Sequence, residues 1–448
     1  MNGSLVQGTP APLRFLPSAP ARVKLLPIAR FGGPVGVARV GAFPGEASDE
    51  LAAEVRNPAL TILEYIAPSR IGGAETYFLR LVAHLGRAGH RVIVVTKRDC
   101  ALRRELEARV AQMVNVEIHA WHTHGKTDAQ SLARLCRLIR AEHVDLVHTH
   151  LTTASLLGSM AGRICGVPVA CHVHCAEKKT YFQFGDYLIA VAEGVRQHLL
   201  RQGVNPAKVP VLHYGLDLDF FRNPMPRAQA RRQLGLPDAV KIVGVVASLQ
   251  ERKGHRYLLR ALADLGPDLG PVHAVFAGEG PLEKALRAQA RRLKLSENVH
   301  FLGFRDDIST VLSACDIVAL PSRKEGLSIA TMEAMALGRP VVVTPVAGMP
   351  ELVKERVTGL LVPAGETAPL SRALETIWRD PALQNALSRN GRAWLEQKFD
   401  QRDCMRRIES FLVEAARSWQ NGERVDCATW GPECPTGTPA YQFAPLSV

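Results

Sequence analysis

Short apolar runs alternate along the chain with segments whose apolar residues recur every three or four positions. Thr61–Ala67, Arg91–Thr96 and Val114–Ala120 are runs of the first kind, whereas Glu75–Ala88 and Ser131–Arg140 have the helical spacing. Short buried strands that alternate with amphipathic helices are typical of βαβ units and a parallel sheet. Three further runs are expected to complete this sheet, namely Val144–His148, Val167–His174 and Tyr187–Ala192.

The alternation starts again at Lys241, after a proline-containing stretch, Phe221–Pro237, that we interpret as the join between two domains. The expected strands of this second half are Lys241–Ala247, Ala274–Ala277, Val299–Leu302, Ile317–Leu320 and Val341–Thr344. The expected helices are Tyr257–Leu265, Leu282–Leu293, Ile308–Ala314, Ser328–Ala336 and Pro350–Lys354. The pattern predicts an α/β fold of two facing, Rossmann-like, doubly wound parallel-sheet domains. Ligands of such sheets bind outside the carboxyl ends of the strands, so we expect the site in the cleft between the domains.

The two ends of the chain differ from this pattern. Residues 1–58 are rich in proline and poor in acidic residues, so we expect a mostly disordered extension; the alternative is an overlong start before Thr61. We place the first domain at 59–222 and the second at 223–400. A helix over 401–420 is expected to pack back on the first domain, and 421–448 is expected to be a tail.

Composition limits the class of partner. The 448 residues include 55 Lys and Arg against 43 Asp and Glu, a net charge of +12, which favours anionic partners. No run of about 18 apolar residues is present, so we expect no membrane-spanning helix. Arg134, Arg137 and Arg140 share one expected helix, either as a solvated face or as a patch for an anionic membrane surface. No nucleic-acid motif accompanies them, and nine cysteines without repeated spacing indicate free thiols.

Two short motifs suit a phosphate group. Gly72 and Gly73 lie between an expected strand and helix, where glycine permits close backbone approach and a helix N-terminus favours an anion. Arg252 and Lys253 follow the first strand of the second half, and an adjacent guanidinium and ammonium suit a diphosphate. A plain tight turn and a solvated charged turn are the alternatives.

Glu325 and Glu333 are eight residues apart, one in the loop after Ile317–Leu320 and the other in the next helix. A carboxylate there accepts hydrogen bonds from sugar hydroxyls, while backbone N–H groups at the helix start hold a phosphate. Those N–H groups belong to Gly326, Leu327 and Ser328. Helix capping or solvation is the alternative for each glutamate alone.

The string Cys171-His172-Val173-His174-Cys175 contains four potential zinc ligands. Alternate side chains of a strand point to opposite faces, so the two cysteines share one face and the two histidines the other. We therefore predict that no metal is bound. A histidine at the carboxyl end of a strand, such as His150 or His174, is a better catalytic candidate.

Together these motifs resemble the retaining glycosyltransferases of family 4, which have the two-domain GT-B architecture. The resemblance extends from about Thr61 to Gln401. The motifs that carry it are Ile71–Glu75, Asp145–His150, Pro168 with His174, Leu212–Asp217, Lys253-Gly254, Gly278–Pro281, Glu325 with Glu333, and Ala347–Glu351.

The resemblance implies a role for each matched residue. Gly72 and Gly73 would line the donor diphosphate and the acceptor side, and Lys253 with Arg252 would neutralise the diphosphate. Glu325 would hold hydroxyls of the donor sugar and Glu333 the nucleotide ribose. The base would meet the backbone near Phe304, and His174 would lie near the reacting carbon. The resemblance implies no metal cofactor.

One departure affects the donor site. Ala247-Ser248-Leu249 stands where the family often has Gly-Arg-Leu, so Ser248 occupies the position of the usual diphosphate arginine. We expect Arg252 to compensate. The expected function is transfer of a hexose from a UDP- or GDP-sugar to a glycan or lipid-linked acceptor, in the cytoplasm or on the inner face of the membrane. The alternatives are a nucleotide-sugar epimerase and a non-catalytic membrane-associated subunit with a degraded donor site.

Overall fold

A computed structural model of the chain describes residues 59–68 and 72–431. The extension expected over residues 1–58 lies outside the described residues, as do Ile71 and the expected tail from residue 432 onward.

The first domain contains a six-stranded sheet in the order β3-β2-β1-β4-β5-β6, with every pairing parallel. Its strands read as continuous apolar runs because helices cover both faces of such a sheet; in β2, residues Val92–Val95 are all buried. The strands are β1 (Thr61–Ile66), β2 (Arg91–Lys97), β3 (Val116–Trp121), β4 (Leu146–His150), β5 (Val169–Val173) and β6 (Tyr187–Ala190).

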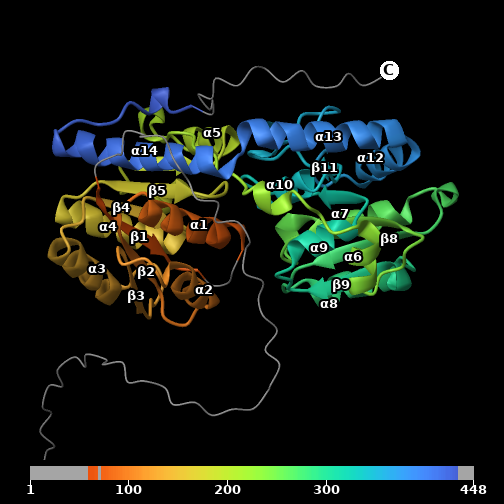
Figure 1. The fold of residues 1–448 in the computed structure, drawn as a ribbon, viewed down its shortest axis with the longest axis horizontal. Helices are drawn as coiled ribbons and strands as arrows, with labels where there is room; N and C mark the ends of the chain where they lie inside the picture. The colour runs from red at the N-terminus through yellow and green to blue at the C-terminus, as the bar shows by residue number, and fades with distance from the viewer. Residues whose placement is uncertain (1–58, 69–71, 432–448) are drawn as a thin grey trace, which may run out of the picture. The chain divides into compact units, whose positions relative to one another are not determined.

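Helices flank this sheet (Figure 1). In α1 (Gly73–Arg87), Tyr77, Leu81 and Leu85 recur every four residues and are buried, which is the amphipathic spacing of a helix that packs on a sheet. The other helices of this domain are α2 (Ala101–Val110), α3 (Ala129–Ala141), α4 (Thr152–Cys165) and α5 (Glu193–Arg201).

The second domain repeats the architecture with a sheet in the order β12-β11-β10-β7-β8-β9, again parallel throughout. The expectation of two doubly wound parallel sheets is confirmed. The strands are β7 (Lys241–Val246), β8 (Val272–Ala277), β9 (Val299–Gly303), β10 (Ile317–Leu320), β11 (Val341–Val343) and β12 (Leu360–Leu361). The helices are α6 (Arg227–Gln233), α7 (His255–Ala263), α8 (Glu283–Arg292), α9 (Ile308–Ala314), α10 (Ile329–Ala336), α11 (Met349–Leu352), α12 (Thr367–Arg379) and α13 (Pro381–Lys398).

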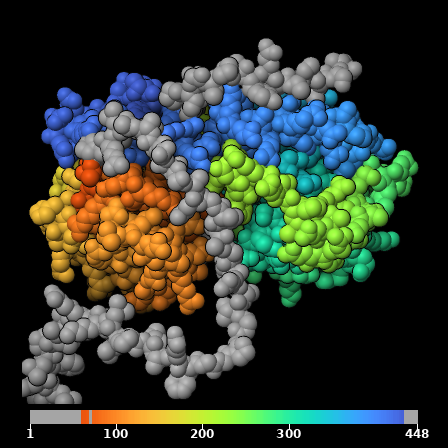
Figure 2. Space-filling model, in the orientation of Figure 1, coloured from red at the N-terminus to blue at the C-terminus, as the bar shows by residue number. Residues whose placement is uncertain are grey.

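The last helix, α14 (Gln401–Gln420), lies against the first domain (Figure 2, blue beside orange and yellow). Glu409 contacts His84 of α1 at 2.8 Å, and the Trp419 indole donates to the carbonyl of Gly166 at 3.0 Å. The part of the expected tail that is described packs on the same domain, since the Val425 N–H donates to the Tyr187 hydroxyl at 3.1 Å. No helix among residues 59–431, the undescribed gap apart, combines the length and the apolar character needed to cross a bilayer.

The chain passes between the two domains at two neighbouring points. Leu216, near the end of the first domain, donates its N–H to the carbonyl of Phe399 at 2.8 Å and accepts from the Gln401 N–H at 3.1 Å. Gly215 permits this approach, because a Cβ at that position would overlap the backbone of Asp400. The two connecting segments are thus bonded to each other directly before α14.

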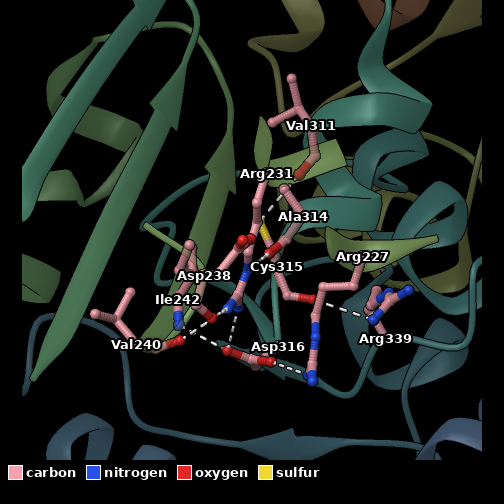
Figure 3. Close-up of polar contacts among 10 residues, drawn as sticks. All are labelled: Arg227, Arg231, Asp238, Val240, Ile242, Val311, Ala314, Cys315, Asp316 and Arg339. Carbon is pink, nitrogen blue, oxygen red and sulfur yellow. Dashed lines mark hydrogen bonds and ion pairs between the residues drawn. The ribbon is translucent and has the colours of Figure 1, made fainter. Parts of the chain in front are cut away.

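The stretch expected to be a plain join, Phe221–Pro237, contains helix α6, which is anchored to the second sheet by a buried ion pair. The Arg231 side chain is 3% exposed and donates from Nη2 to the Asp316 carboxylate at 2.8 Å (Figure 3). Its other nitrogens donate to the carbonyls of Asp238, Val240 and Ala314 at 2.6–3.0 Å. Every group of the buried guanidinium is therefore paired, as its burial requires.

Replacing Arg231 with Met should lower the free energy of unfolding by about 3–5 kcal/mol, because the Asp316 carboxylate would remain buried without its buried cationic partner. Chemical denaturation followed by circular dichroism measures this change. Arg227 also contacts Asp316, at 2.5 Å, but its side chain is 53% exposed. The matched control Arg227→Met should therefore cost less than about 1 kcal/mol. Equal losses in the two variants would contradict this interpretation.

Candidate active site

Three loops meet at the carboxyl edge of the second sheet, following the adjacent strands β7, β8 and β10. Glycines bring them together: Gly254 has φ +74° and Gly278 has φ +144°, values that side chains other than hydrogen rarely allow. A Cβ on Gly254 would overlap the carbonyl of Pro321, and one on Gly278 would overlap the carbonyl of Ala247. The β7 loop is therefore in backbone contact with both of its neighbours.

This packing brings Lys253 and Glu325 together across 72 residues of sequence. Lys253 Nζ lies 2.5 Å from Glu325 Oε1, which also accepts a hydrogen bond from the Ser322 hydroxyl at 2.7 Å. The two side chains are only 14% and 8% exposed. A single cation is thus held in place beside a carboxylate that retains a second oxygen for further hydrogen bonds.

The residues after Glu325 lead into α10 and contact the first domain. The Ser328 hydroxyl caps the helix by accepting from the Thr331 N–H at 3.3 Å, and the carbonyl of Leu327 accepts from the Tyr214 hydroxyl. A Cβ on Gly326 would overlap the carbonyl of His174. Cys175 also donates from Sγ to the Glu325 carbonyl at 3.2 Å. His174 therefore lies directly beside the Lys253–Glu325 pair.

The two glycines of the first domain approach the same helix. Gly72 and Gly73 are exposed, and a Cβ on Gly73 would lie 3.4 Å from Cδ1 of Ile329, the first residue of α10. Gly72 has φ −156°, which is ordinary extended backbone. A glycine at this position therefore serves close approach to the backbone and does not relieve strain.

Glu333 lies one turn into α10 and faces Arg80 of α1. Burial raises the pKa of Glu333 to about 7, and the positive charge of Arg80 opposes that shift. Burial likewise lowers the pKa of Arg80, with Glu333 acting against the change. Two charged groups from different domains are thus kept in a poorly solvated setting.

The remaining predicted residues lie around this centre. Ser248 is half-buried in the β7 loop, and Arg252 donates from Nε to the Gln250 side chain at 3.0 Å. Burial and the charge of Glu325 raise the pKa of the Cys175 thiol, and the charge of Arg252 opposes this, so Arg252 is also near the centre. Phe304 follows the edge strand β9, is 58% exposed and donates its N–H to Glu279 at 3.4 Å.

The structure also contains a buried cluster of ionisable groups that the sequence interpretation missed in part. His148 and His150 on β4, and His172 with His174 at the end of β5, lie on one face of the sheet, and Glu64 of β1 lies beside them. The repeated His-x-His pattern in two neighbouring parallel strands, with His150 opposite His172, is the signal that indicates this cluster. The ring nitrogens of His148, His150 and His172 lie within 4.8 Å of one another.

The prediction that Cys171, His172, His174 and Cys175 do not bind a metal ion stays a prediction. The thiol of Cys175 donates to the Glu325 carbonyl, away from the rings of His172 and His174, which stack with centroids 4.7 Å apart. His148 and Glu64 lie outside this string and complete the cluster. Hydrogen bonds join neighbouring members of the cluster. The rings of His150 and His172 are stacked, with an angle of 17° between their planes. Three rings on one ion would instead have to aim their nitrogens at a common point.

Comparison with known proteins identifies the fold and the family. Residues 71–220 match the model of Glycosyltransferase Family 4, and residues 226–394 match that of Glycosyl transferases group 1. D-inositol 3-phosphate glycosyltransferases of Mycobacterium tuberculosis and Mycobacterium bovis are 30% identical over 349 residues, covering 69% of this chain and 71% of theirs.

Among solved structures, Anabaena HepE in complex with UDP-glucose is 26% identical with a TM-score of 0.71, over 79% of this chain and 100% of that one. The lipopolysaccharide glycosyltransferase WaaG, at 18% identity and a TM-score of 0.62, covers 79% of this chain and 99% of its own and shares the fold. The chain therefore belongs to glycosyltransferase family 4 and has the two-domain GT-B architecture.

Proposed function

We propose that the protein transfers a hexose from a nucleotide sugar to an acceptor hydroxyl with retention of anomeric configuration. The observation that carries the proposal is the Lys253–Glu325 pair at the carboxyl edge of the second sheet. Cleavage of a nucleotide sugar leaves a diphosphate with a growing negative charge and a sugar that must be held by its hydroxyls. A fixed cation beside a carboxylate serves these two needs at adjacent points.

The donor is a UDP-linked hexose in this proposal, with a GDP-linked one as the alternative. Support comes from the complexes of HepE with UDP and with UDP-glucose, at 25–26% identity. Lys253 and Arg252 hold the diphosphate, and the backbone of Gly326–Ser328 assists. Glu325 holds the sugar, Glu333 the ribose, and the base lies near Phe304. Gly72 and Gly73 approach from the first domain, and His174 lies by the reacting carbon.

The leaving diphosphate is neutralised by side chains and backbone dipoles, so we propose that no divalent metal is needed. Arg252 takes over from the arginine that Ser248 replaces. In the proposed front-face reaction, the acceptor oxygen bonds to the anomeric carbon as the bond to the diphosphate breaks. The acceptor proton passes to the departing diphosphate, which leaves charge and atoms balanced. Exclusion of water from the site prevents hydrolysis of the donor.

The acceptor is a glycan or a lipid-linked sugar in this proposal. The enzyme would work in the cytoplasm, with the arginines of α3 meeting an anionic membrane surface. The mycobacterial relatives favour a second candidate, since their name gives inositol 3-phosphate as acceptor. Product analysis with both acceptor classes separates the two. Isomerised UDP-sugar formed without acceptor would favour an epimerase, and absence of nucleotide-sugar binding would favour a non-catalytic subunit.

Lys253→Ala should weaken binding of the nucleotide sugar by roughly 10- to 100-fold, because a charge-assisted hydrogen bond to the diphosphate contributes about 1.5–3 kcal/mol. Titration calorimetry with UDP-glucose measures the change. Lys284, the second residue of α8, is exposed, and its side chain forms no ion pair with the described residues. The control Lys284→Ala should bind within twofold of the wild type, and equal losses would contradict a specific diphosphate contact.

Affinity for UDP-glucose should rise about tenfold between pH 6 and pH 8. An ionised Glu333 accepts from both ribose hydroxyls, and with a pKa of about 7 its ionised fraction grows from roughly one tenth to nine tenths over that range. A nucleotide sugar is the right probe, because its diphosphate has no terminal group that titrates near neutrality. Glu333→Gln should bind with the same affinity at both pH values; a persistent tenfold change would assign the titration elsewhere.

The product formed from an α-linked UDP-hexose should be the α-anomer, as front-face transfer requires. The one-bond and three-bond couplings of the anomeric proton, read by NMR on the isolated product, determine the configuration. A β-linked product would rule out the retaining reaction while leaving transfer itself intact.

A further inference from the structure

The hydrogen bonds of the Glu64–histidine cluster determine which ring nitrogen of each histidine carries the hydrogen. Glu64, His148, His150 and His172 are fully buried, and each oxygen of the Glu64 carboxylate has one histidine partner. His148 Nδ1 lies 2.9 Å from Oε1, and His150 Nε2 lies 3.0 Å from Oε2. Within the described part of the chain, no lysine or arginine forms an ion pair with Glu64.

An ionised carboxylate only accepts hydrogen bonds, so the ring nitrogens that face it must carry hydrogen. A neutral imidazole has one N–H, which leaves a lone pair on His150 Nδ1. His174 Nε2 lies 3.0 Å from that atom and must therefore donate to it. By the same reasoning, His172 Nδ1 donates to His148 Nε2 over 3.3 Å.

His150, His172 and His174 are neutral because they are buried. Burial lowers the pKa of His174 to about 3, and it lowers the pKa values of His150 and His172 well below their usual range, with neighbouring histidines adding to the effect. The tautomers that follow leave two ring nitrogens as acceptors, His172 Nε2 and His174 Nδ1. These are the two cluster nitrogens that have no hydrogen-bond partner among the described residues.

The two ends of the cluster differ in their surroundings. The rings of His172 and His174 both pack against Tyr77, with centroids 5.0 and 5.7 Å away, but His174 also packs against Tyr214, whose hydroxyl donates to the Leu327 carbonyl. His174 lies at the carboxyl end of β5, with its carbonyl against Gly326 and its neighbour Cys175 bonded to the Glu325 carbonyl. The hydrogen-bonded series Glu64, His150 and His174 therefore extends from the centre of the sheet to the loop that contains Glu325 and Gly326.

We propose that Glu64 is a positioning residue that acts through His150 to fix the Nε2–H tautomer of His174, which presents its Nδ1 lone pair to the donor sugar. This inference rests on the proposed function. The anomeric carbon gains positive charge as the diphosphate leaves. A lone pair is the negative end of the imidazole dipole and stabilises that charge, whereas an N–H at the same point would oppose it. His174 is the catalytic residue of this arrangement, and Glu64 and His150 orient it.

Glu64→Leu removes the hydrogen-bond acceptor that fixes the tautomers of His150 and His174. His150 then moves its hydrogen from Nε2, which has lost its acceptor, to Nδ1, donates to His174 Nε2, and so shifts the hydrogen of His174 to Nδ1. Removing one partner of buried hydrogen bonds is destabilising, so we expect a variant that folds with lower stability than the wild type. We expect kcat to fall at least tenfold and the Kd for UDP-glucose to stay within threefold, because the tautomer acts on the transition state.

Nitrogen-15 NMR of the histidine rings reads the tautomer directly. The wild type should show a lone pair at His174 Nδ1 and the variant a lone pair at His174 Nε2. His172→Asn is the matched control, because its amide still donates to His148 and it lies outside the path to His174. Its kcat should stay within threefold of the wild type.

Two results with Glu64→Leu would overturn the inference: an unchanged His174 tautomer, or an inverted tautomer with an unchanged kcat. Stoichiometric metal bound by these rings would also overturn it, because the lone pairs of His148 and His150 would then hold the ion. If Glu64→Leu does not fold, Glu64→Gln tests the same point where its amide faces His150, an orientation that nitrogen-15 NMR identifies by a lone pair on His150 Nε2. A wild type without transferase activity but with the expected tautomers would refute the proposed function alone.

Discussion

The backbone contact between Gly254 and the carbonyl of Pro321 is the constraint on which the donor side of the site depends. Parallel strands bring their carboxyl ends to one edge, but side chains from neighbouring loops would still lie several ångströms apart. The left-handed backbone of Gly254 turns the β7 loop directly onto the β10 loop, and this places Lys253 against Glu325. Any residue with a Cβ at position 254 would push the loops apart and separate the cation from the carboxylate.

The first domain meets this edge through backbone as well. Gly326 packs on the carbonyl of His174, and the Tyr214 hydroxyl donates to the carbonyl of Leu327. The Glu351 carboxylate, from the second domain, accepts from the N–H groups of Glu193 and Gly194 at the start of α5. Contacts to main-chain atoms do not depend on the identity of most side chains. The pattern of glycines is therefore the part of the sequence that specifies how closely the loops approach.

The sequence predicted the strands well where both faces of the sheet are covered, because a run such as Val92–Val95 has few other interpretations. β4 begins two residues later than expected, since Asp145 bonds through its carboxylate to the N–H of Thr61 and so precedes the strand. The interpretation of Phe221–Pro237 as a join misses helix α6, because an arginine-rich segment between prolines gives no sign that Arg231 is buried. Lys253 and Glu325 were singled out from local motifs and a family resemblance. The role of Glu64 depends on strand register, which no single strand reveals.

The paired connection at Leu216 has a mechanical consequence. Two hydrogen bonds join the chain segments that connect the domains. Rotation about the paired segments keeps both hydrogen bonds, whereas sliding one segment along the other breaks them. The second of these segments, at Phe399–Gln401, leads into α14, and the contacts of α14 with the first domain hold its far end in place. Any relative movement of the two halves that keeps these hydrogen bonds is therefore a rotation about the paired segments.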